Sequence, residues 1–237
     1  RGESDLTVAG KLFCDRFPPD KIPALPTCGI FLRREFPLKN NLEFPEGIHP
    51  CEDGLFSHFV LALTEKISFC PEAVYHYRQH EQGNHHQIRK RTADILPMIP
   101  RWLSLIEEFY EQRHLWKRKA GHLVRFIEHE PFELRLLGMP FSPPEQEILY
   151  SIIRDFLTAH CTAAECRRAS LHLPFRLLLQ SSGFSDFGRR LRRAGKNTGI
   201  RRKLLHFCPV PSWRRNGRAQ LRQVREQLEE IRRNITF

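Results

Sequence analysis

Apolar residues in this sequence change their spacing near residue 90. Before that point strand and helix patterns alternate: a short strand is predicted over 27–34, a helix over 55–66 and an extended segment over 67–78. Pro71 limits the last segment to an edge strand or two short strands, because proline has no N–H to donate to a ladder. The pattern predicts an α/β protein in which a small sheet is followed by a helix-rich remainder.

Helical spacing dominates the middle of the chain. Leu103, Ile106 and Phe109 form an apolar stripe, which predicts a helix that begins once Pro97 and Pro100 are passed. Further helical patterns cover 122–137, 143–161 and 162–179. Prolines are favoured in the first turn of a helix, so the second of these should start at its leading proline pair.

The end of the chain has a different composition. Residues 181–217 mix Gly, Ser and Arg, which predicts a loosely ordered stretch with short helical pieces. A final amphipathic helix is predicted from apolar residues spaced three and four apart: Leu221, Val224, Leu228, Ile231 and Ile235. The chain thus divides into three predicted parts, namely 1–90, a helical extension over 91–180 and a basic tail over 181–237.

Basic residues are concentrated in the last third of the chain. Residues 167–237 contain 18 Lys and Arg against 4 Asp and Glu, and 16 of the 18 are Arg. This excess is larger than solubility requires, so we expect contact with an anionic membrane surface, a nucleic acid or a phosphorylated ligand. A solvated helix face is the neutral alternative. Nucleic acid is the less favoured partner, because no recognised binding motif accompanies the arginines.

Cysteine usage and hydropathy bear on the compartment. The seven Cys are odd in number and include no CxxC pair, which favours a reducing environment. No window holds the ~18 consecutive apolar residues of a membrane span. We therefore expect a cytoplasmic protein that is either soluble or peripheral at the inner face of the membrane. His160, Cys161 and Cys166 have marginal spacing for metal ligands, and idle thiols are the preferred reading, so no metal site is predicted.

Two adjacent carboxylates, Glu52 and Asp53, come between a Pro- and Gly-rich loop and the predicted helix of 55–66. One hypothesis makes them structural, with Asp53 as an N-cap whose side chain accepts a free backbone N–H. The other makes them functional, because the helix dipole keeps a carboxylate at this position ionised and able to accept a proton. Caps are the commoner case for an isolated pair of this kind.

A second polar cluster follows the extended segment. Arg78 lies among four histidines that include His80, and one helix and one strand separate this cluster from Asp53. A guanidinium and imidazoles in that loop could hold a diphosphate while the carboxylate faces an acceptor hydroxyl. Solvated loop histidines are the simpler alternative. His49 is assigned to the acceptor side from its loop position alone.

Residues 26–84 resemble the second half of the catalytic domain of family 2 glycosyltransferases, which are inverting nucleotide-sugar enzymes of the GT-A fold. Many bacterial members have an FPEG-like phrase, an ED pair that opens a helix and a strand that closes with YxYR. The corresponding segments here are TCGIFLRREF (27–36), LEFPEG (42–47), CEDGLF (51–56) and VYHYRQHEQGN (74–84). Four phrases in order at the customary intervals are more specific than any one of them.

The resemblance implies a role for each candidate residue. Asp53 would be the base that deprotonates the acceptor hydroxyl, and Glu52 would orient the acceptor or the base. Arg78 would neutralise the leaving diphosphate, with His80 as a second diphosphate contact. The resemblance also implies a nucleotide-sugar donor and a glycan or lipid-linked acceptor of the bacterial cell envelope.

A divalent metal, Mg²⁺ or Mn²⁺, is expected in the complete enzyme, held by a DxD pair on an earlier strand. This sequence contains no DxD. We therefore expect residues 1–90 to be the second half of a GT-A, Rossmann-like domain from a longer enzyme, and the chain to be inactive alone. A naturally truncated product is the competing account. The alternative of another class is a non-enzymatic basic helical protein, in which Glu52 and Asp53 are only caps.

Overall fold

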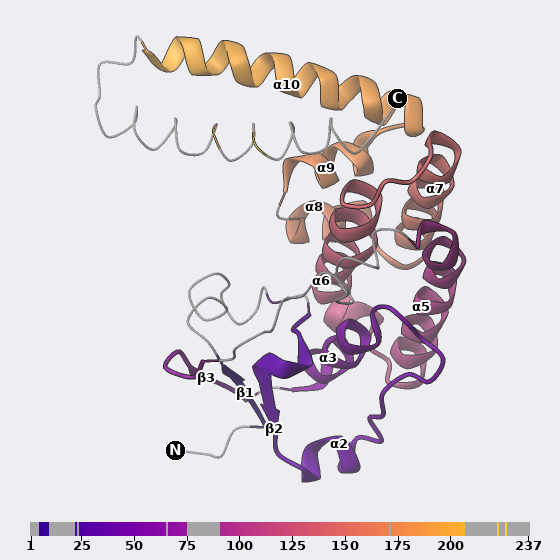
Figure 1. The fold of residues 1–237 in the computed structure, drawn as a ribbon, viewed down its shortest axis with the longest axis vertical. Helices are drawn as coiled ribbons and strands as arrows, with labels where there is room; N and C mark the ends of the chain where they lie inside the picture. Colours follow the sequence, from indigo (N-terminus) through magenta and orange to yellow (C-terminus); the bar gives the residue numbers. More distant parts are fainter. Residues whose placement is uncertain are drawn as a thin grey trace.

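The computed structural model has a small mixed sheet below a larger body of helices (Figure 1). The residues that it describes are 5–9, 22, 24–64, 66–74, 91–170, 172–206, 222 and 226. For 196–206 only the backbone is described. At this level the predicted class is confirmed, since the described residues form a helix-rich α/β protein.

The sheet has the strand order β2-β1-β3, with β1 (Leu6–Ala9) in the centre. The strand β2 (Ile30–Leu32) pairs with β1 in antiparallel fashion, and β3 (Ile67–Cys70) pairs with it in parallel. Leu6 and Val8 alternate with Thr7 and are fully buried, as expected for a strand with one face on the core. The central strand β1 was not predicted from the sequence.

The predicted elements before residue 90 are found with shifted ends. The strand expected over 27–34 is shorter, because the 3-10 turn η2 (Thr27–Gly29) precedes β2. The extended segment begins as predicted at residue 67, and β3 ends directly before Pro71. Its continuation from 75 to 78 lies outside the described residues. The predicted helix is α3 (Glu52–Leu63), which contacts η2, α5 and α6.

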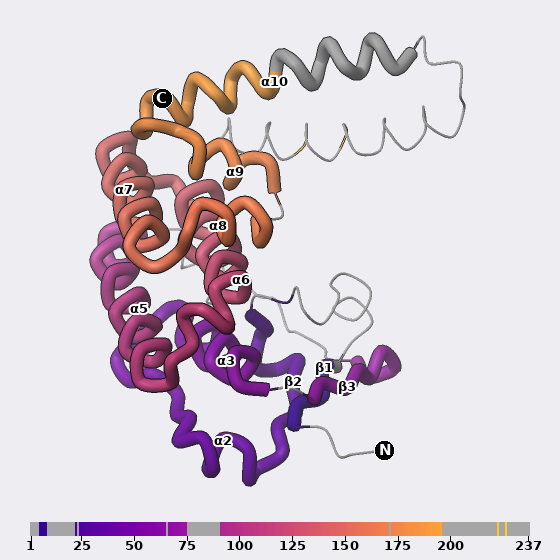
Figure 2. The backbone as a smooth tube through the Cα atoms, turned by 180° about the vertical axis from the view of Figure 1, so that it is seen from behind, coloured from indigo at the N-terminus to yellow at the C-terminus, as the bar shows by residue number. Residues whose placement is uncertain are grey.

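Helices make up most of the rest of the described chain (Figure 2). Their bounds are α2 (Glu35–Lys39), α5 (Thr92–Gln112), α6 (Trp116–Ile127), η3 (Glu128–Leu137), α7 (Pro143–His160), α8 (Ala163–Ala169), α9 (Leu173–Gln180) and α10 (Phe184–His206). The expected start of α7 at Pro143 is confirmed. Just before it, the Glu145 carboxylate accepts the Ser142 backbone N–H at 2.7 Å, which caps the helix.

Prolines lie inside two helices, and in the first of them their position differs from the prediction. The helix α5 begins at Thr92, so Pro97 and Pro100 lie inside it, although the sequence pattern places its start after them. Each proline removes one backbone hydrogen bond, and burial of Ile99 and Trp102 on the same helix offsets the loss. Pro131 lies within η3, a π-helix, in which its missing N–H likewise leaves one backbone hydrogen bond unmade.

The helix α10 corrects a second expectation. Residues 184–206 form one continuous helix rather than short pieces in a loose stretch. Phe187 is fully buried and anchors the helix on its neighbours. Asp186 accepts hydrogen bonds from the Ser182 backbone N–H and the Arg190 side chain, which stabilise the first turn. The predicted final helix lies outside the described residues, except that Arg222 and Glu226 are helical and exposed.

One hydrophobic core joins the sheet to the helices, from Leu6 in β1 to Leu191 in α10. The helix α3 lies between the sheet and the helical body in both views (Figures 1 and 2). It is buried along most of its length, including the polar residues Ser57 and His58. Among the described residues, no helix is long and apolar enough to cross a membrane.

A histidine pair joins α3 to α6. The His58 ring, fully buried, stacks on His122 with 4.3 Å between ring centroids, and its Nε2 lies 3.2 Å from the Tyr110 hydroxyl. His122 Nε2 lies 3.1 Å from the His58 carbonyl oxygen, and the neutral ring donates this bond. Burial is the main cause that lowers the pKa of His122 from 6.5 to about 4, and Lys119 and Arg125 lower it further.

We predict that the fold loses stability as pH falls from about 6.5 to 4. In this window the unfolded chain binds a proton at position 122 and the folded chain does not, so acid favours unfolding. His122→Gln keeps a donor for the His58 carbonyl but cannot titrate. The free energy of unfolding of the wild type should therefore fall by about 1 to 3 kcal/mol more than that of the variant.

Denaturant unfolding at matched pH values measures this difference. Carboxyl groups titrate in both proteins and cancel in the comparison. Parallel curves for the wild type and His122→Gln would show that His122 is not the source of the acid sensitivity.

Candidate functional site

The loop that enters α3 sets where the two predicted carboxylates lie. Cys51 has a left-handed backbone conformation, with a φ of 90°, and is the last residue before the helix. The predicted N-cap position of Asp53 is therefore wrong, because Glu52 and Asp53 occupy the first two helical positions. A left-handed conformation costs a residue with a Cβ roughly 1 to 3 kcal/mol, so the surroundings of buried Cys51 must hold it in place.

Asp53 is half-buried in the first turn of α3. Its Oδ1 accepts a hydrogen bond from the Gly54 backbone N–H at 2.8 Å, so it satisfies one of the free donors of the helix start. Burial raises the pKa of the carboxyl group, and the nearby charges of Glu130 and Glu52 raise it further, while the Gly54 bond opposes them. The net pKa is raised, which makes the carboxylate a stronger proton acceptor.

Glu52 and His49 lie at the exposed rim of the same turn. His49 Nδ1 is 3.2 Å from Glu52 Oε1, and both side chains keep about two fifths of their surface exposed, at 41% and 38%. A contact of this kind restricts the rotamers of both side chains. The structure therefore brings together three of the predicted residues at the start of α3, and Asp53 is the one whose pKa is raised.

An ion pair that the sequence did not indicate lies beneath this turn. The Arg135 guanidinium donates to Glu130 Oε2 at 3.0 Å, and both side chains are about nine-tenths buried. The Cys51 thiol hydrogen-bonds to Glu130, and burial with this contact raises the pKa of the thiol. Glu130 and Arg135 both belong to η3, so the π-helix and the start of α3 are held against each other.

Close packing explains why a glycine follows Asp53. A Cβ at Gly54 would lie 3.0 Å from Cys51 Sγ and 3.2 Å from Glu130 Oε1. The first contact is at the limit of what real side chains show, so any larger residue would push the thiol or the carboxylate away. Absence of a side chain at Gly54 thus allows η3 to approach the helix start.

The two predicted diphosphate contacts, Arg78 and His80, lie outside the described residues. Their convergence with Asp53 on one cleft stays a prediction. Glu130 and Arg135 were missed because they are far from Asp53 in the sequence. The one available signal was Pro131 between them, which marks an irregular helix but does not say what that helix faces.

No group of His, Cys, Asp and Glu side chains in the described ranges is arranged to hold a metal ion. The Mg²⁺ or Mn²⁺ expected for a complete enzyme therefore stays an implication of the family resemblance. What the described residues provide is one half-buried carboxylate at a helix start, a second at the rim and a compensated ion pair below. Such a turn can accept a proton from a bound hydroxyl.

Comparison with models of protein families, with curated proteins and with solved structures finds no match to this chain.

We predict that Asp53→Asn raises the melting temperature at neutral pH, because it removes a charge that burial disfavours. A carboxyl group whose pKa is higher in the folded chain than its unfolded value of 3.8 weakens the fold once ionised. The gain should therefore vanish below pH 3.8 and grow as pH rises through the folded-state pKa.

Thermal melts from acid to neutral pH measure this gain. Asp155→Asn removes an exposed carboxylate from α7 and is the matched control for loss of the same chemical group. A destabilised Asp53→Asn protein at neutral pH would mean that the carboxylate serves the fold as a cap.

Proposed function

We propose that the chain supplies the acceptor side of an inverting glycosyltransferase of the GT-A type, with Asp53 as general base. The observation that carries the proposal is the half-buried Asp53 carboxylate in the first turn of α3, with its raised pKa and Glu52 beside it. A carboxylate that only caps a helix is stabilised in its ionised form, whereas a raised pKa is more typical of a functional site. The ordered FPEG, ED and YxYR phrases supply the reaction class.

In the proposed reaction, an Asp53 oxygen takes the proton of an acceptor hydroxyl. The acceptor oxygen then attacks the anomeric carbon of the donor sugar from the face opposite the diphosphate. The bond from that carbon to the diphosphate breaks, and its electron pair leaves with the diphosphate. Inversion follows from this geometry, and Arg78 is assigned to the negative charge that develops on the leaving group.

The surrounding residues have positioning roles in this proposal. His49 holds Glu52 at the rim, where its carboxylate can accept a hydrogen bond from the acceptor glycan. Arg135 pairs with Glu130 and so partly compensates the carboxylate whose charge raises the pKa of Asp53. A divalent metal in the complete enzyme would supply positive charge to the diphosphate.

We predict that Asp53→Asn lowers sugar transfer by about 10²- to 10⁴-fold, the usual contribution of a positioned base. The assay uses a protein in which this sequence follows a donor-binding half, because the sequence itself contains no DxD. Product formation from a nucleotide-sugar donor is measured, with circular dichroism to verify folding. Glu52→Gln should mainly weaken acceptor binding and thus raise KM.

Asp155→Asn is again the control, since it changes the same chemical group at an exposed site. Turnover that survives in a folded Asp53→Asn protein would remove Asp53 from the role of base.

One observation favours the second candidate function, a basic helix that binds an anionic membrane surface. The helix α10 is a single long helix, and it carries exposed Arg192 and Arg193 beyond its buried anchor Phe187. Juxtaposed arginines on an ordered helix are attracted to anionic headgroups, by about 1 kcal/mol each near the surface. This function is compatible with the proposed enzyme, whose acceptor could be linked to a lipid.

We predict that the double variant Arg192→Gln/Arg193→Gln weakens binding to phosphatidylglycerol vesicles by about tenfold at low salt. The double variant Lys117→Gln/Arg118→Gln removes the same charge from exposed positions of α6 and should bind nearly as well as the wild type. Vesicle sedimentation at several salt concentrations is the measurement. Tight RNA binding together with indifference to vesicles would favour the nucleic-acid alternative.

A further inference from the structure

A hollow of about 420 Å³ lies between α7, α8 and α9, on the helical body and apart from the start of α3. Its basic lining residues are Arg154 on α7, Arg167 on α8 and Arg176 on α9, and we call it the arginine pocket. The three helices that form its walls lie together in Figure 2. A volume of this size falls in the range of small-ligand sites.

The positive charge of the arginine pocket is not balanced by acidic residues among the described residues that line it. Its described lining residues include three arginines and no Asp or Glu. Glu165, the acid of α8, is engaged elsewhere: its carboxylate accepts the Thr162 backbone N–H at 2.8 Å and the Thr162 hydroxyl at 2.7 Å. Within the described part of the chain, none of the three pocket arginines forms an ion pair.

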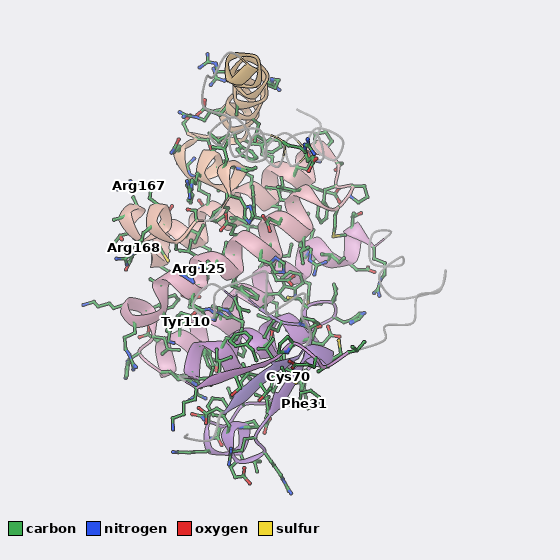
Figure 3. All side chains as sticks on the ribbon, turned by 90° about the vertical axis from the view of Figure 1, so that its left-hand side faces the viewer. Phe31, Cys70, Tyr110, Arg125, Arg167 and Arg168 are labelled. Atoms are coloured by element: carbon green, nitrogen blue, oxygen red, sulfur yellow. The ribbon has the colours of Figure 1, made fainter. Side chains whose placement is uncertain are left out.

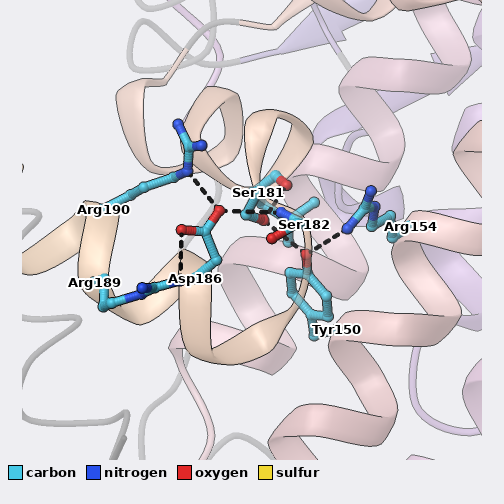
Figure 4. A network of polar contacts seen from close by, with 8 residues as sticks. Tyr150, Arg154, Ser181, Ser182, Asp186, Arg189 and Arg190 are labelled. Atoms are coloured by element: carbon cyan, nitrogen blue, oxygen red, sulfur yellow. Dashed lines mark hydrogen bonds and ion pairs between the residues drawn. The ribbon is translucent and has the colours of Figure 1, made fainter.

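Arg154 is held in place by a chain of hydrogen bonds (Figure 4). Its Nη1 donates to the Tyr150 hydroxyl at 3.0 Å, and that hydroxyl lies 2.7 Å from Ser181 Oγ. Ser181 in turn donates to the Leu178 carbonyl oxygen at 2.6 Å, so its hydroxyl accepts from Tyr150. The chain fixes one end of the guanidinium, and the remaining N–H groups can serve a ligand.

Arg176, on α9, is also held by a hydrogen bond. Its Nη2 donates to the Ser170 carbonyl oxygen at 2.8 Å. Arg167 extends from α8 at the edge of the helical body (Figure 3), where it is exposed. Two guanidinium groups held by hydrogen bonds and one exposed to solvent thus surround the same space. Arginine forks bind carboxylate and phosphate groups alike, but a phosphate has oxygens for all three guanidinium groups, whereas a carboxylate has only two.

We propose that the arginine pocket binds the phosphate or diphosphate group of a small ligand. Leu157 and Leu179 line the pocket beside the arginines and offer an apolar surface for the part of the ligand that bears the phosphate. The ligand class is therefore a phosphate ester rather than a bare polyanion. This site is separate from the proposed transfer chemistry and does not depend on it.

The pocket contains its own reporter group. Cys161 and Cys166 both line it, and the Cys161 thiol donates a hydrogen bond to the Cys166 sulfur. This bond raises the pKa of Cys161 and lowers the pKa of Cys166, with Arg167 as a further cause that lowers it. Cys166 is therefore the thiol of the pair that ionises more readily. Its side chain is buried and lines the pocket, so a bound anion should slow its labelling by blocking access and opposing its ionisation.

The experiment uses the full chain and inorganic pyrophosphate as the probe. Isothermal titration measures affinity, and mass spectrometry follows the rate of iodoacetamide labelling at each cysteine. Saturable binding with slower labelling of Cys166 is expected, while exposed Cys28 keeps its rate. Phosphatidylglycerol vesicles, added in a separate arm, compete for the site if a lipid headgroup is the source of the phosphate and leave pyrophosphate binding unchanged if it is a free ester.

Neighbouring arginines on α8 provide a matched pair of variants. Arg167→Gln removes a lining residue and should weaken pyrophosphate binding by about fivefold. Arg168→Gln removes the next residue, which is exposed but does not line the pocket, and should change the affinity less than twofold. Arg154→Gln should weaken binding by about tenfold.

Arg167 has an exposed side chain, so its variant tests the site even if Arg154→Gln fails to fold. Equal losses for Arg167→Gln and Arg168→Gln would overturn the proposal, because they would indicate diffuse attraction by the basic surface. Absence of saturable pyrophosphate binding, with Cys166 labelled at an unchanged rate, would overturn it as well.

Discussion

The buried pair of Glu130 and Arg135 is the contact on which the candidate site depends. A buried carboxylate is tolerated only when its charge is compensated, and loss of one partner from such a pair costs about 3 to 5 kcal/mol. Here the pair also receives the Cys51 thiol, which holds a left-handed residue immediately before α3. Through this contact a π-helix far along the chain fixes the first turn of α3, and with it the depth of Asp53.

Burial of α3 has two results that act in opposite directions. Its apolar residues tie the sheet to the helical body, so the helix stabilises the fold. Its first turn carries a carboxylate into a partly desolvated position, where ionisation weakens the fold. Groups that are kept at a cost to stability are concentrated at sites of chemistry. The arginine pocket has a similar character, since like charges are gathered there around a space rather than paired.

Apolar spacing and proline positions predicted those helices and strands whose formation depends mainly on neighbouring residues. The helix α3 and the end of β3 before Pro71 follow from apolar spacing and from the missing proline N–H. The strand β1 was missed because four residues are too short for a period to be recognised, and its place depends on partners from distant segments. Similarly, α10 reads as a polar, glycine-containing stretch, and its continuity comes from the anchor that Phe187 forms with other helices. Glu52, Asp53 and His49 could be proposed from one loop, whereas Glu130 and Arg135 required the fold.

The position of β1 makes both strand pairs of the sheet depend on one short segment, residues 6–9. It is hydrogen-bonded on both sides, antiparallel to β2 and parallel to β3, and those two strands do not pair with each other. Proteolytic removal of residues up to 9 would therefore break the hydrogen bonds of both strand pairs at once. The edges of β2 and β3 that faced β1 would be left unpaired, and an unpaired edge tends to pair with another chain. Phe31 on β2 is already 65% exposed. The trimmed molecule would then be prone to exchange strands with other copies. The solubility of the intact molecule therefore depends on the short strand β1.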